Sequence, residues 1–304
     1  MEAFKSLLNG MQMSINKLIF CGNSSIDHIL THKGAKETIG GSAVNAAISG
    51  SLFGNKEIAL ISSVGYDFPI DTLDKLNIST EHMQQYEENT NSFIIDEINN
   101  TVSLKSKQYL PIIIPDNTET NHLHVSCRKG VPFVDAFNKI KSQHYSLDVM
   151  WSSVKDFLPE LSACIQKADF LFCNDTEFMM MKREGLIDTV PENLIIFTTD
   201  KHGVIYQKGK KQKYFHTIKK EDVVSTIGAG DTFLGSFLSS FNGNNLNEAV
   251  YQSLAMASLS TEDFGNMHLL NKFSEINKTK NIIRNMDKNN ETTFNIYNRP
   301  VLQR

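Results

Sequence analysis

The feature that most constrains the fold of this chain is a regular alternation of short apolar strand-like runs with helix-like segments. Lys17–Cys21 has the pattern of a buried strand, Ser42–Leu52 that of a helix, and Glu57–Val64 that of a second strand. A strand, a helix and a strand within roughly fifty residues are typical of a parallel βαβ unit. The alternation continues through His122–Ser126, Val131–Ile140, Ala168–Cys173, Thr176–Arg183, Leu194–Thr198 and Thr232–Phe241. We therefore predict an α/β fold: a three-layer α/β/α sandwich around a mainly parallel, Rossmann-like central sheet.

One hairpin interrupts this alternation. Asn91–Ile98 and Val102–Lys107 are β-type runs on either side of a short polar turn. Such a hairpin either extends the edge of a sheet or covers a cleft as a lid. The chain has no internal repeat and no linker rich in Pro, Gly or Ser, so residues 1–304 are predicted to form one domain.

Composition and charge narrow the class of protein. Of 304 residues, 40% are hydrophobic and 21% charged, which is enough apolar material for a large core. The net charge of -4 gives no global basic field for nucleic acid, and no apolar run is long enough for a membrane span. The four cysteines are scattered without a CxxC pair, and Met1–Asn16 lacks the apolar stretch of a secretion signal. We therefore expect a cytoplasmic protein without a nucleic-acid or membrane partner.

A glycine-rich segment, Ser225–Phe233, comes directly before a predicted helix. Its glycines leave backbone N–H groups uncovered, and such amides at a helix N-terminus typically bind phosphate. A phosphate would repel the carboxylate of Asp231, unless that group serves to take a proton from an attacking hydroxyl. The alternative is an ordinary glycine-rich turn in which Asp231 caps the helix.

Polar residues also follow the first predicted strand. Gly40 and Gly41 open a helix on which Asn45 offers both a donor and an acceptor to sugar hydroxyls. Asp27 lies beyond the carboxyl end of the first strand, where open α/β sheets bind ligands. Taken singly, an aspartate such as Asp27 is more often a loop or capping residue.

Two further strand ends carry polar groups. Asn174 and Glu177, three residues apart, either form a capping box or place an amide and a carboxylate near phosphate and Mg²⁺-bound water. Thr198–Gly203 follows the strand that begins at Leu194. Polar residues thus follow four predicted strands of one doubly wound fold. One shared cleft explains this better than four unrelated turns.

On these motifs the chain resembles the ribokinase-like (PfkB) carbohydrate kinase family, over about Lys17 to Met286. Ser225–Asp231 nearly completes the family's acidic-Thr-x-Gly-Ala-Gly-Asp run, Gly40–Ala47 matches its di-glycine helix start, and Asn174–Glu177 its Asn-x-x-Glu motif. The resemblance implies an ATP-dependent phosphotransferase that uses Mg²⁺. It also implies a small β-lid, formed by about residues 28–39 and 91–107.

The resemblance assigns roles by position. Asp231 would be the catalytic base. The amides of Ala229, Gly230 and Asp231 would form an anion hole, with Gly228 also part of the catalytic segment. The residues implied at the acceptor are Asp27, Gly40, Gly41 and Asn45. Those implied at the nucleotide are Asn174, Thr198, Gly203, Gly228, Gly230 and Gly265, while Glu177 would hold Mg²⁺ through water.

Two departures from the family pattern leave questions open, and so does the identity of the acceptor. Ser225 replaces the usual Asp, so a monovalent cation is uncertain, and Asp200 replaces a glycine near the nucleotide. The leading interpretation is phosphorylation of a hydroxymethyl group on a small sugar, as in ribokinase and fructokinase. The alternatives are a nucleoside, a sugar phosphate, or a homologue that binds sugar or nucleoside without turnover. A homodimer formed through the lid is also left open.

Two weaker candidates are interpreted as structural. His122 and His124 alternate with Leu123 and Val125, which is the pattern of a half-buried strand rather than a metal site. Arg128 and its neighbouring lysine are interpreted as a solvated strand end rather than as a site for a phosphorylated acceptor.

Overall fold

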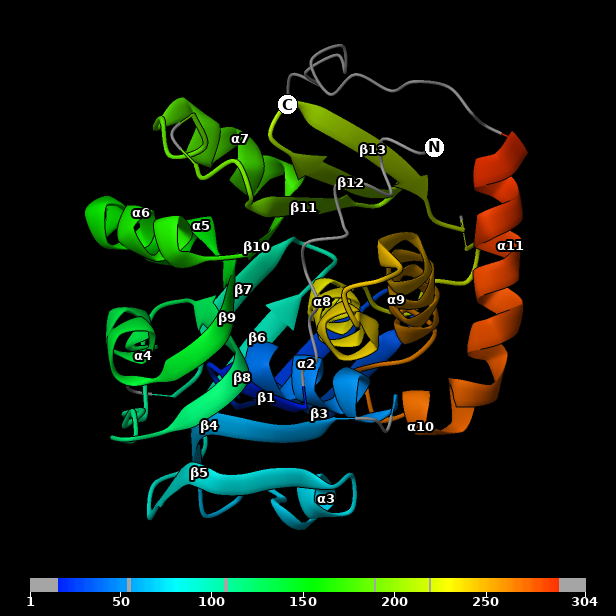
Figure 1. Cartoon of the computed structure of the whole chain (residues 1–304). Coiled ribbons are helices and arrows are strands. Elements are labelled where there is room, and N and C mark those ends of the chain that lie inside the picture. Colours follow the sequence, from blue (N-terminus) through cyan, green and yellow to red (C-terminus); the bar gives the residue numbers. More distant parts are fainter. Residues whose placement is uncertain (1–15, 54–55, 107–108, 189, 219, 290–304) are drawn as a thin grey trace.

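The computed structural model describes residues 16–53, 56–106, 109–188, 190–218 and 220–289 (Figure 1). A nine-stranded sheet forms its centre, in the order β13-β12-β11-β10-β9-β8-β1-β4-β5. The strands are β1 Lys17–Cys21, β4 Glu57–Gly65, β5 Ile78–Tyr86, β8 Glu119–Cys127, β9 Lys141–Val149, β10 Phe170–Asn174, β11 Ile195–Asp200, β12 Gly203–Lys208 and β13 Lys211–His216. Neighbouring strands are parallel except at β12, which is antiparallel to both β11 and β13. The predicted mainly parallel sheet is confirmed.

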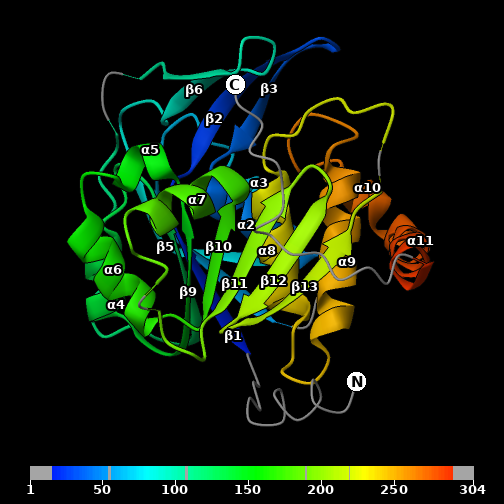
Figure 2. The same cartoon turned by 90° about the horizontal axis from the view of Figure 1, so that it is seen from above.

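Helices cover both faces of this sheet (Figures 1 and 2). On one side lie α2 Ser42–Ser51, α8 Ala229–Ser240 and α9 Leu246–Ser260, with α11 Ile276–Asn289 packed on α9. On the other side lie α4 Phe133–Lys139, α5 Trp151–Val154, α6 Leu158–Lys167 and α7 Asp175–Arg183. The short helices are α3 Asp71–Asp74, α10 Leu269–Lys272 and a 3₁₀ turn at Phe273–Glu275. The three-layer sandwich is therefore confirmed.

The alternation of side chains along the strands builds two cores. In β1, Leu18 and Phe20 enter the core on the α2 and α8 side, whereas Ile19 and Cys21 enter the other. Buried strands with helices on both faces need apolar residues at successive positions, which explains the continuous apolar run of β1.

A second, four-stranded sheet lies above the carboxyl ends of the central strands, in the order β3-β2-β6-β7 (Figure 2). Its strands are β2 Ser25–Thr31, β3 Gly34–Gly40, β6 Ser92–Asp96 and β7 Thr101–Leu104. Both segments predicted for the lid contribute to it, although residue 107 lies outside the described residues. Because this sheet faces the same cavity as Asp231, it is a lid rather than an extension of the main sheet.

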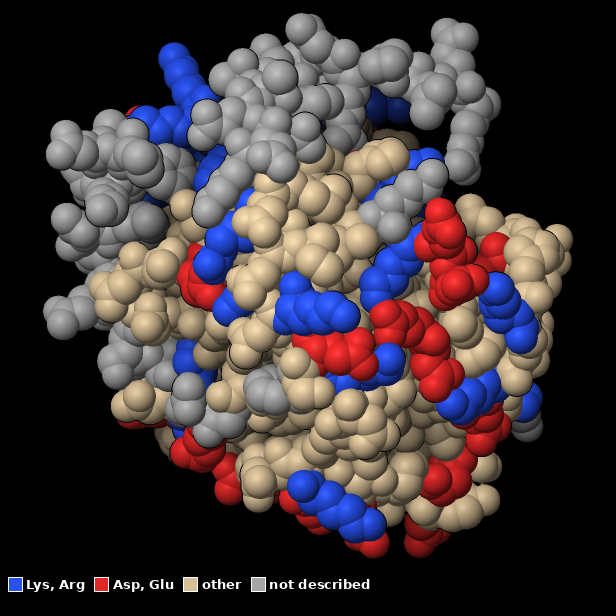
Figure 3. Space-filling view, turned by 90° about the vertical axis from the view of Figure 1, so that its right-hand side faces the viewer, with Lys and Arg blue, Asp and Glu red and all other residues tan. Residues whose placement is uncertain are grey.

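Charges of both signs are interspersed on the face that carries α11 (Figure 3). Lys280 and Arg284 of α11 both pair with Glu248 of α9, and Lys272 pairs with Glu262. The two pairs of Glu248 join α11 to α9. Among the described residues, no helix is both long and apolar enough to cross a bilayer.

Candidate active site

A cavity of about 710 Å³ lies between the carboxyl ends of the central strands and the lid. The predicted residues that line it are Asp27, Gly41, Asn45, Asn174, Glu177, Gly228, Gly230 and Asp231. The other predicted residues all lie in the described part of the chain but do not line the cavity: Gly40, Thr198, Gly203, Ala229 and Gly265. The fold thus gathers the core of the predicted site from four separate regions of the chain.

The glycine-rich loop leads directly into α8 and leaves its first turn open. Gly228 is the N-cap residue, with a left-handed φ of 79°, and no side chain caps the helix. A Cβ added at Gly230 would meet nothing within 4 Å, so the backbone there borders free space. The amide of Ala229 already donates to the carbonyl of Thr226 at 3.2 Å. This open, uncapped helix start is suited to an anion.

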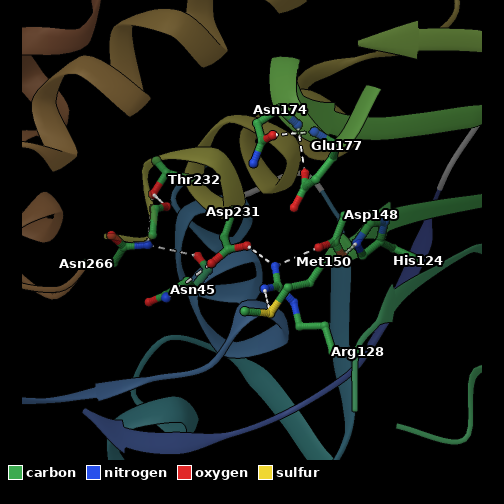
Figure 4. A network of polar contacts seen from close by, with 11 residues as sticks. Asn45, His124, Arg128, Asp148, Met150, Asn174, Glu177, Asp231, Thr232 and Asn266 are labelled. Atoms are coloured by element: carbon green, nitrogen blue, oxygen red, sulfur yellow. Dashed lines mark hydrogen bonds and ion pairs between the residues drawn. The ribbon is translucent and has the colours of Figure 1, made fainter. Parts of the chain in front are cut away.

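Asn266, which sequence reasoning missed, fixes this loop from behind. Its side-chain amide donates to Thr232 Oγ1 at 2.9 Å and to the backbone carbonyl of Asn45 at 3.2 Å. Thr232 Oγ1 in turn donates to the carbonyl of Gly228 at 2.8 Å. One buried amide therefore joins α2 to the start of α8 (Figure 4).

Asp231 projects from the first turn of α8 into the cavity (Figure 4). Asn45 Nδ2 lies 3.5 Å from one of its carboxylate oxygens, and Arg128 Nη2 lies 3.3 Å from the other. Burial raises the pKa of Asp231 above its ordinary value; the Arg128 guanidinium opposes this shift, and the charge of Asp148 adds to it. A carboxylate with a raised pKa and long, loose hydrogen bonds is suited to accept a proton.

Arg128 and Asp148 line the cavity, although the sequence interpretation set Arg128 aside and did not name Asp148. Arg128 is not a solvated strand end: it pairs with Asp148 at 2.7 Å and with Asp231 at 3.3 Å, so that interpretation was wrong. The physical reason is that the turn after β8 directs the side chain inward, toward carboxylates on β9 and α8. His124 is completely buried and lies 3.1 Å from Asp148, so it supports this pair.

Asp27 lies at the base of the lid, in the third position of β2, and is 5% exposed. Burial raises its pKa to about 6, and the nearby charge of Asp231 adds to the shift. Its Oδ1 atom is buried without a hydrogen-bond partner. A Cβ on Gly40 would overlap the carboxylate, so Gly40 is required to give Asp27 its place. A buried carboxylate oxygen that is left without a partner is suited to a ligand hydroxyl.

Asn174 and Glu177 form the capping box that was one of the two interpretations made from the sequence; the placement near phosphate and Mg²⁺ stays a prediction. The side chain of Asn174 accepts from the amide of Glu177, and Glu177 accepts from the amide of Asn174, each at 2.8 Å. This capping box begins α7, and both residues also line the cavity. Burial raises the pKa of Glu177 to about 7. No three His, Cys, Asp or Glu side chains among the described residues gather into a metal site. Glu177 would therefore hold Mg²⁺ together with nucleotide phosphates rather than alone.

Three residues predicted to border the nucleotide, Thr198, Gly203 and Gly265, do not line the cavity. Thr198 is 6% exposed, and its neighbour Thr199 lines the cavity instead. Gly203 is held by Asp200, which accepts its amide at 3.0 Å, so the substituted carboxylate closes the turn between β11 and β12. Gly265 lies against the lid, where a Cβ would overlap Thr38 of β3. Nucleotide contacts for these residues stay predictions.

An apolar wall lines the lid side of the cavity. It consists of side chains on β6, on β7 and just after them: Phe93, Ile95, Val102, Leu104 and Tyr109. Phe93 is opposite Leu104, and Ile95 opposite Val102, so all four share one face of the lid. The rings of Phe93 and Tyr109 lie 6.3 Å apart. Val102 is 56% exposed, an unusual exposure for an aliphatic side chain that lines a cavity.

The lid also touches the glycine-rich loop directly. Glu97, at the tip between β6 and β7, accepts the amide and the hydroxyl of Thr226 at 2.9 and 2.6 Å. Ser225 is buried and accepts the amide of Ile227 at 3.2 Å. The loop is therefore held from inside by Ser225 and from above by the lid.

Comparison with known proteins identifies relatives of this arrangement. A model of the pfkB family of carbohydrate kinases matches residues 16–272. The nucleoside kinase of Methanocaldococcus jannaschii is 28% identical over 289 residues, which cover 83% of this chain and 92% of the relative. The cytidine kinase of Thermococcus kodakarensis is 24% identical over 267 residues, 79% of this chain and 94% of the relative.

Solved structures share the fold. The crystal structure of the M. jannaschii nucleoside kinase superposes with a TM-score of 0.71 at 22% identity, covering 87% of this chain and 98% of that one. A fructokinase from Vibrio cholerae, bound to fructose, ADP and calcium, has a TM-score of 0.70 at 18% identity, with coverage of 84% and 95%.

Proposed function

This chain belongs to the pfkB family of carbohydrate kinases and is a phosphotransferase, and from this premise we propose that it transfers a phosphoryl group from ATP to a hydroxymethyl group of a nucleoside. The sequence alone placed a small sugar first. The observation that reverses this order is the apolar wall beside Asp27: Phe93 is the cross-strand partner of Asp27 in the lid sheet, and both residues line the cavity.

The cavity lining has a polar part and an apolar part, as a nucleoside has a polar ribose and an aromatic base. Asp27 and Asn45 offer polar atoms to ribose hydroxyls, while Phe93 and Tyr109 offer ring surface to a base. A free sugar carries hydroxyl groups around its whole edge, so some of them would face the apolar wall without partners, at a cost in affinity. The relatives named nucleoside kinase and cytidine kinase support the same choice.

The charge of the cavity favours a neutral acceptor over a sugar phosphate. Four carboxyl groups line it, those of Asp27, Asp148, Glu177 and Asp231, against two cations, Arg128 and Lys129. Arg128 is already paired with two of these carboxylates. An acceptor that brought its own phosphate would add like charge to this surface.

The residues present fit ATP and Mg²⁺. The uncapped start of α8 after Gly228 and the open backbone at Gly230 would hold a phosphate, and Asn174 and Glu177 would hold Mg²⁺ through its water ligands. When bound, Mg²⁺ and ATP supply the phosphoryl group and neutralise part of its charge. Asp27 and Asn45 orient the acceptor, and Asp231 takes the proton from its hydroxyl.

A screen of acceptors tests this function. ADP release should be measured with MgATP and a panel that includes cytidine, inosine, adenosine, ribose and fructose. We expect nucleosides to give the highest kcat/KM. Replacing Phe93 by Ala should then raise KM for the nucleoside. A panel in which a free sugar is preferred contradicts the nucleoside assignment but leaves the kinase assignment intact.

Acceptor binding should weaken as the pH falls through about 6. Because the pKa of Asp27 is raised to about 6, its carboxylate is ionised well above this pH and neutral well below it. Only the ionised carboxylate accepts hydrogen bonds at both oxygens. Calorimetric titration of the nucleoside without nucleotide or Mg²⁺ measures this effect apart from Glu177. The dependence should disappear in Asp27→Asn; if it persists there, another group causes it.

We also expect little stimulation by K⁺ over Na⁺. Ser225 carries no negative charge, and its hydroxyl oxygen is engaged by the amide of Ile227. Backbone carbonyls alone would have to supply the ligands for a monovalent ion. The measurement is kcat in KCl and NaCl at equal ionic strength. A steep, saturable activation by K⁺ contradicts this expectation.

A further inference from the structure

Arg128 joins two carboxylates on different elements at the floor of the cavity (Figure 4). Its Nη2 atom lies 2.7 Å from Oδ2 of Asp148 and 3.3 Å from Oδ1 of Asp231. Since Nη2 carries two hydrogens, it can donate one to each carboxylate. The shorter bond is to Asp148 and the longer to Asp231. Arg128 is therefore anchored on β9 and reaches the base on α8 from that anchor.

The anchor itself is firmly held. Asp148 is 5% exposed, and its second oxygen lies 3.1 Å from Nε2 of the fully buried His124. The other nitrogen of His124 lies 2.9 Å from the hydroxyl of Ser146, on the same face of β9. Each oxygen of Asp148 thus has a partner, within a central strand of the sheet. A buried carboxylate with both oxygens satisfied is a rigid support.

We propose that Arg128, anchored by Asp148, is a positioning residue that keeps Asp231 ionised and oriented to accept the hydroxyl proton. The proposal rests on the proposed function, in which Asp231 is the general base. In a cavity that removes water, a lone carboxylate favours its neutral form, which cannot act as a base. Arg128 opposes this, and Asp148 takes up part of its charge, so Asp231 keeps enough basicity to react.

The charges around Asp231 give the proposal a directional test. The charged and titratable groups around Asp231 come from several elements. They are Asp27 of β2, His124 of β8, Arg128 and Lys129 after β8, and Asp148 of β9. Glu177 of α7 acts on Asp231 indirectly, through its charge interaction with Arg128. Burial raises the pKa of Asp231, Arg128 lowers it and Asp148 raises it. Removing Arg128 should therefore raise this pKa, whereas removing the charge of Asp148 should lower it.

The experiment is the pH profile of kcat at saturating acceptor and MgATP, where groups that affect only binding drop out. We expect its acidic limb to move up by about one pH unit in Arg128→Gln and down in Asp148→Asn, since a charge at this range typically shifts a carboxyl pKa by about 1 to 3 units. The maximal kcat of Arg128→Gln should fall by about 10- to 100-fold. Arg128→Lys keeps the charge and should keep the limb near its original pH. The profiles are repeated in a Glu177→Gln background, which removes the titration of that carboxyl group.

Matched controls come from ion pairs outside the cavity. Arg284→Gln breaks the pair with Glu248, and Asp169→Asn removes a carboxylate that accepts from Tyr145. Neither should move the limb. If Arg128→Gln does not fold, Asp148→Asn, which changes no volume, and Arg128→Lys carry the test.

Two results would contradict the inference, and a third measurement separates it from the proposed function. Limbs that stay in place while Tm falls would make the pair a purely structural one. A higher KM for ATP with an unmoved limb would make Arg128 a phosphate ligand instead. Asp231→Asn is measured in parallel: normal turnover in that variant contradicts the proposed function itself, whereas lost turnover with unmoved limbs contradicts only the role of Arg128.

Discussion

Replacement of Asp231 by asparagine is expected to lower kcat by about 10²- to 10⁴-fold, which is the usual cost of losing a general base. Asparagine keeps the size and much of the hydrogen-bonding shape of aspartate but cannot take the hydroxyl proton. Affinity for ATP should be retained, because the uncapped helix start and the open backbone at Gly230 are unchanged. The measurements are kcat by ADP release and the Kd for ATP by calorimetry.

The competing role for Asp231 is that of a helix-stabilising carboxylate. It is an acidic residue in the first turn of α8, where a charge contributes only about 0.3 to 1 kcal/mol. A residue with that role alone would be replaced by asparagine without loss of turnover. Asp116→Asn, which changes an exposed carboxylate paired with Lys139, is the matched control. Normal turnover in Asp231→Asn would remove the central residue of the proposed chemistry.

Removal of the Asp27 side chain is expected to raise the KM for the acceptor by about 10- to 100-fold, since a hydrogen bond to a charged group typically contributes about 1.5 to 3 kcal/mol. The effect should be confined to the acceptor, because Asp27 belongs to β2 of the lid, whereas Asn174 and Glu177 lie at the start of α7. Steady-state kinetics of Asp27→Ala with each substrate varied in turn measures this. An equal rise in the KM for ATP would show that the substitution disturbs the whole cavity.

Gly40→Ala should reproduce part of this loss without touching the carboxylate itself. A methyl group there would overlap Asp27 and displace it. The control is Gly34→Ala at the other end of β3, where a Cβ meets nothing within 4 Å although the backbone has a φ of 135°. If both alanine variants behave alike, the effect comes from the lid strand rather than from the position of Asp27.

The sequence predicted the layers and most of the site, because both depend on local patterns. The apolar run of β1 and the glycines before α8 can be recognised in a single sequence. The structure has a strand and a helix start at these positions, as expected. The strand β9 was missed. Its residues Ser142, His144, Ser146 and Asp148 alternate as polar side chains, whereas a central parallel strand is normally apolar throughout.

The cause of that exception is visible only in three dimensions. Ser146 of β9 is buried and lies within hydrogen-bonding distance of both His122 and His124 of β8, so the polar groups satisfy one another across neighbouring strands. Because Asp148 belongs to the missed strand, the reason for Arg128 to turn inward was missed too. One sequence signal could have revealed the role of Arg128. Asp148 is an acidic residue near the carboxyl end of a segment that was assigned to no helix or strand.

The contact between Glu97 and Thr226 has a thermodynamic consequence. It joins the lid, whose inner face is turned to the acceptor, to the loop that would hold the nucleotide phosphates. Any free energy that the acceptor contributes to holding the lid down therefore also stabilises that loop. Linkage is reciprocal, so we expect each ligand to strengthen the binding of the other by the same factor.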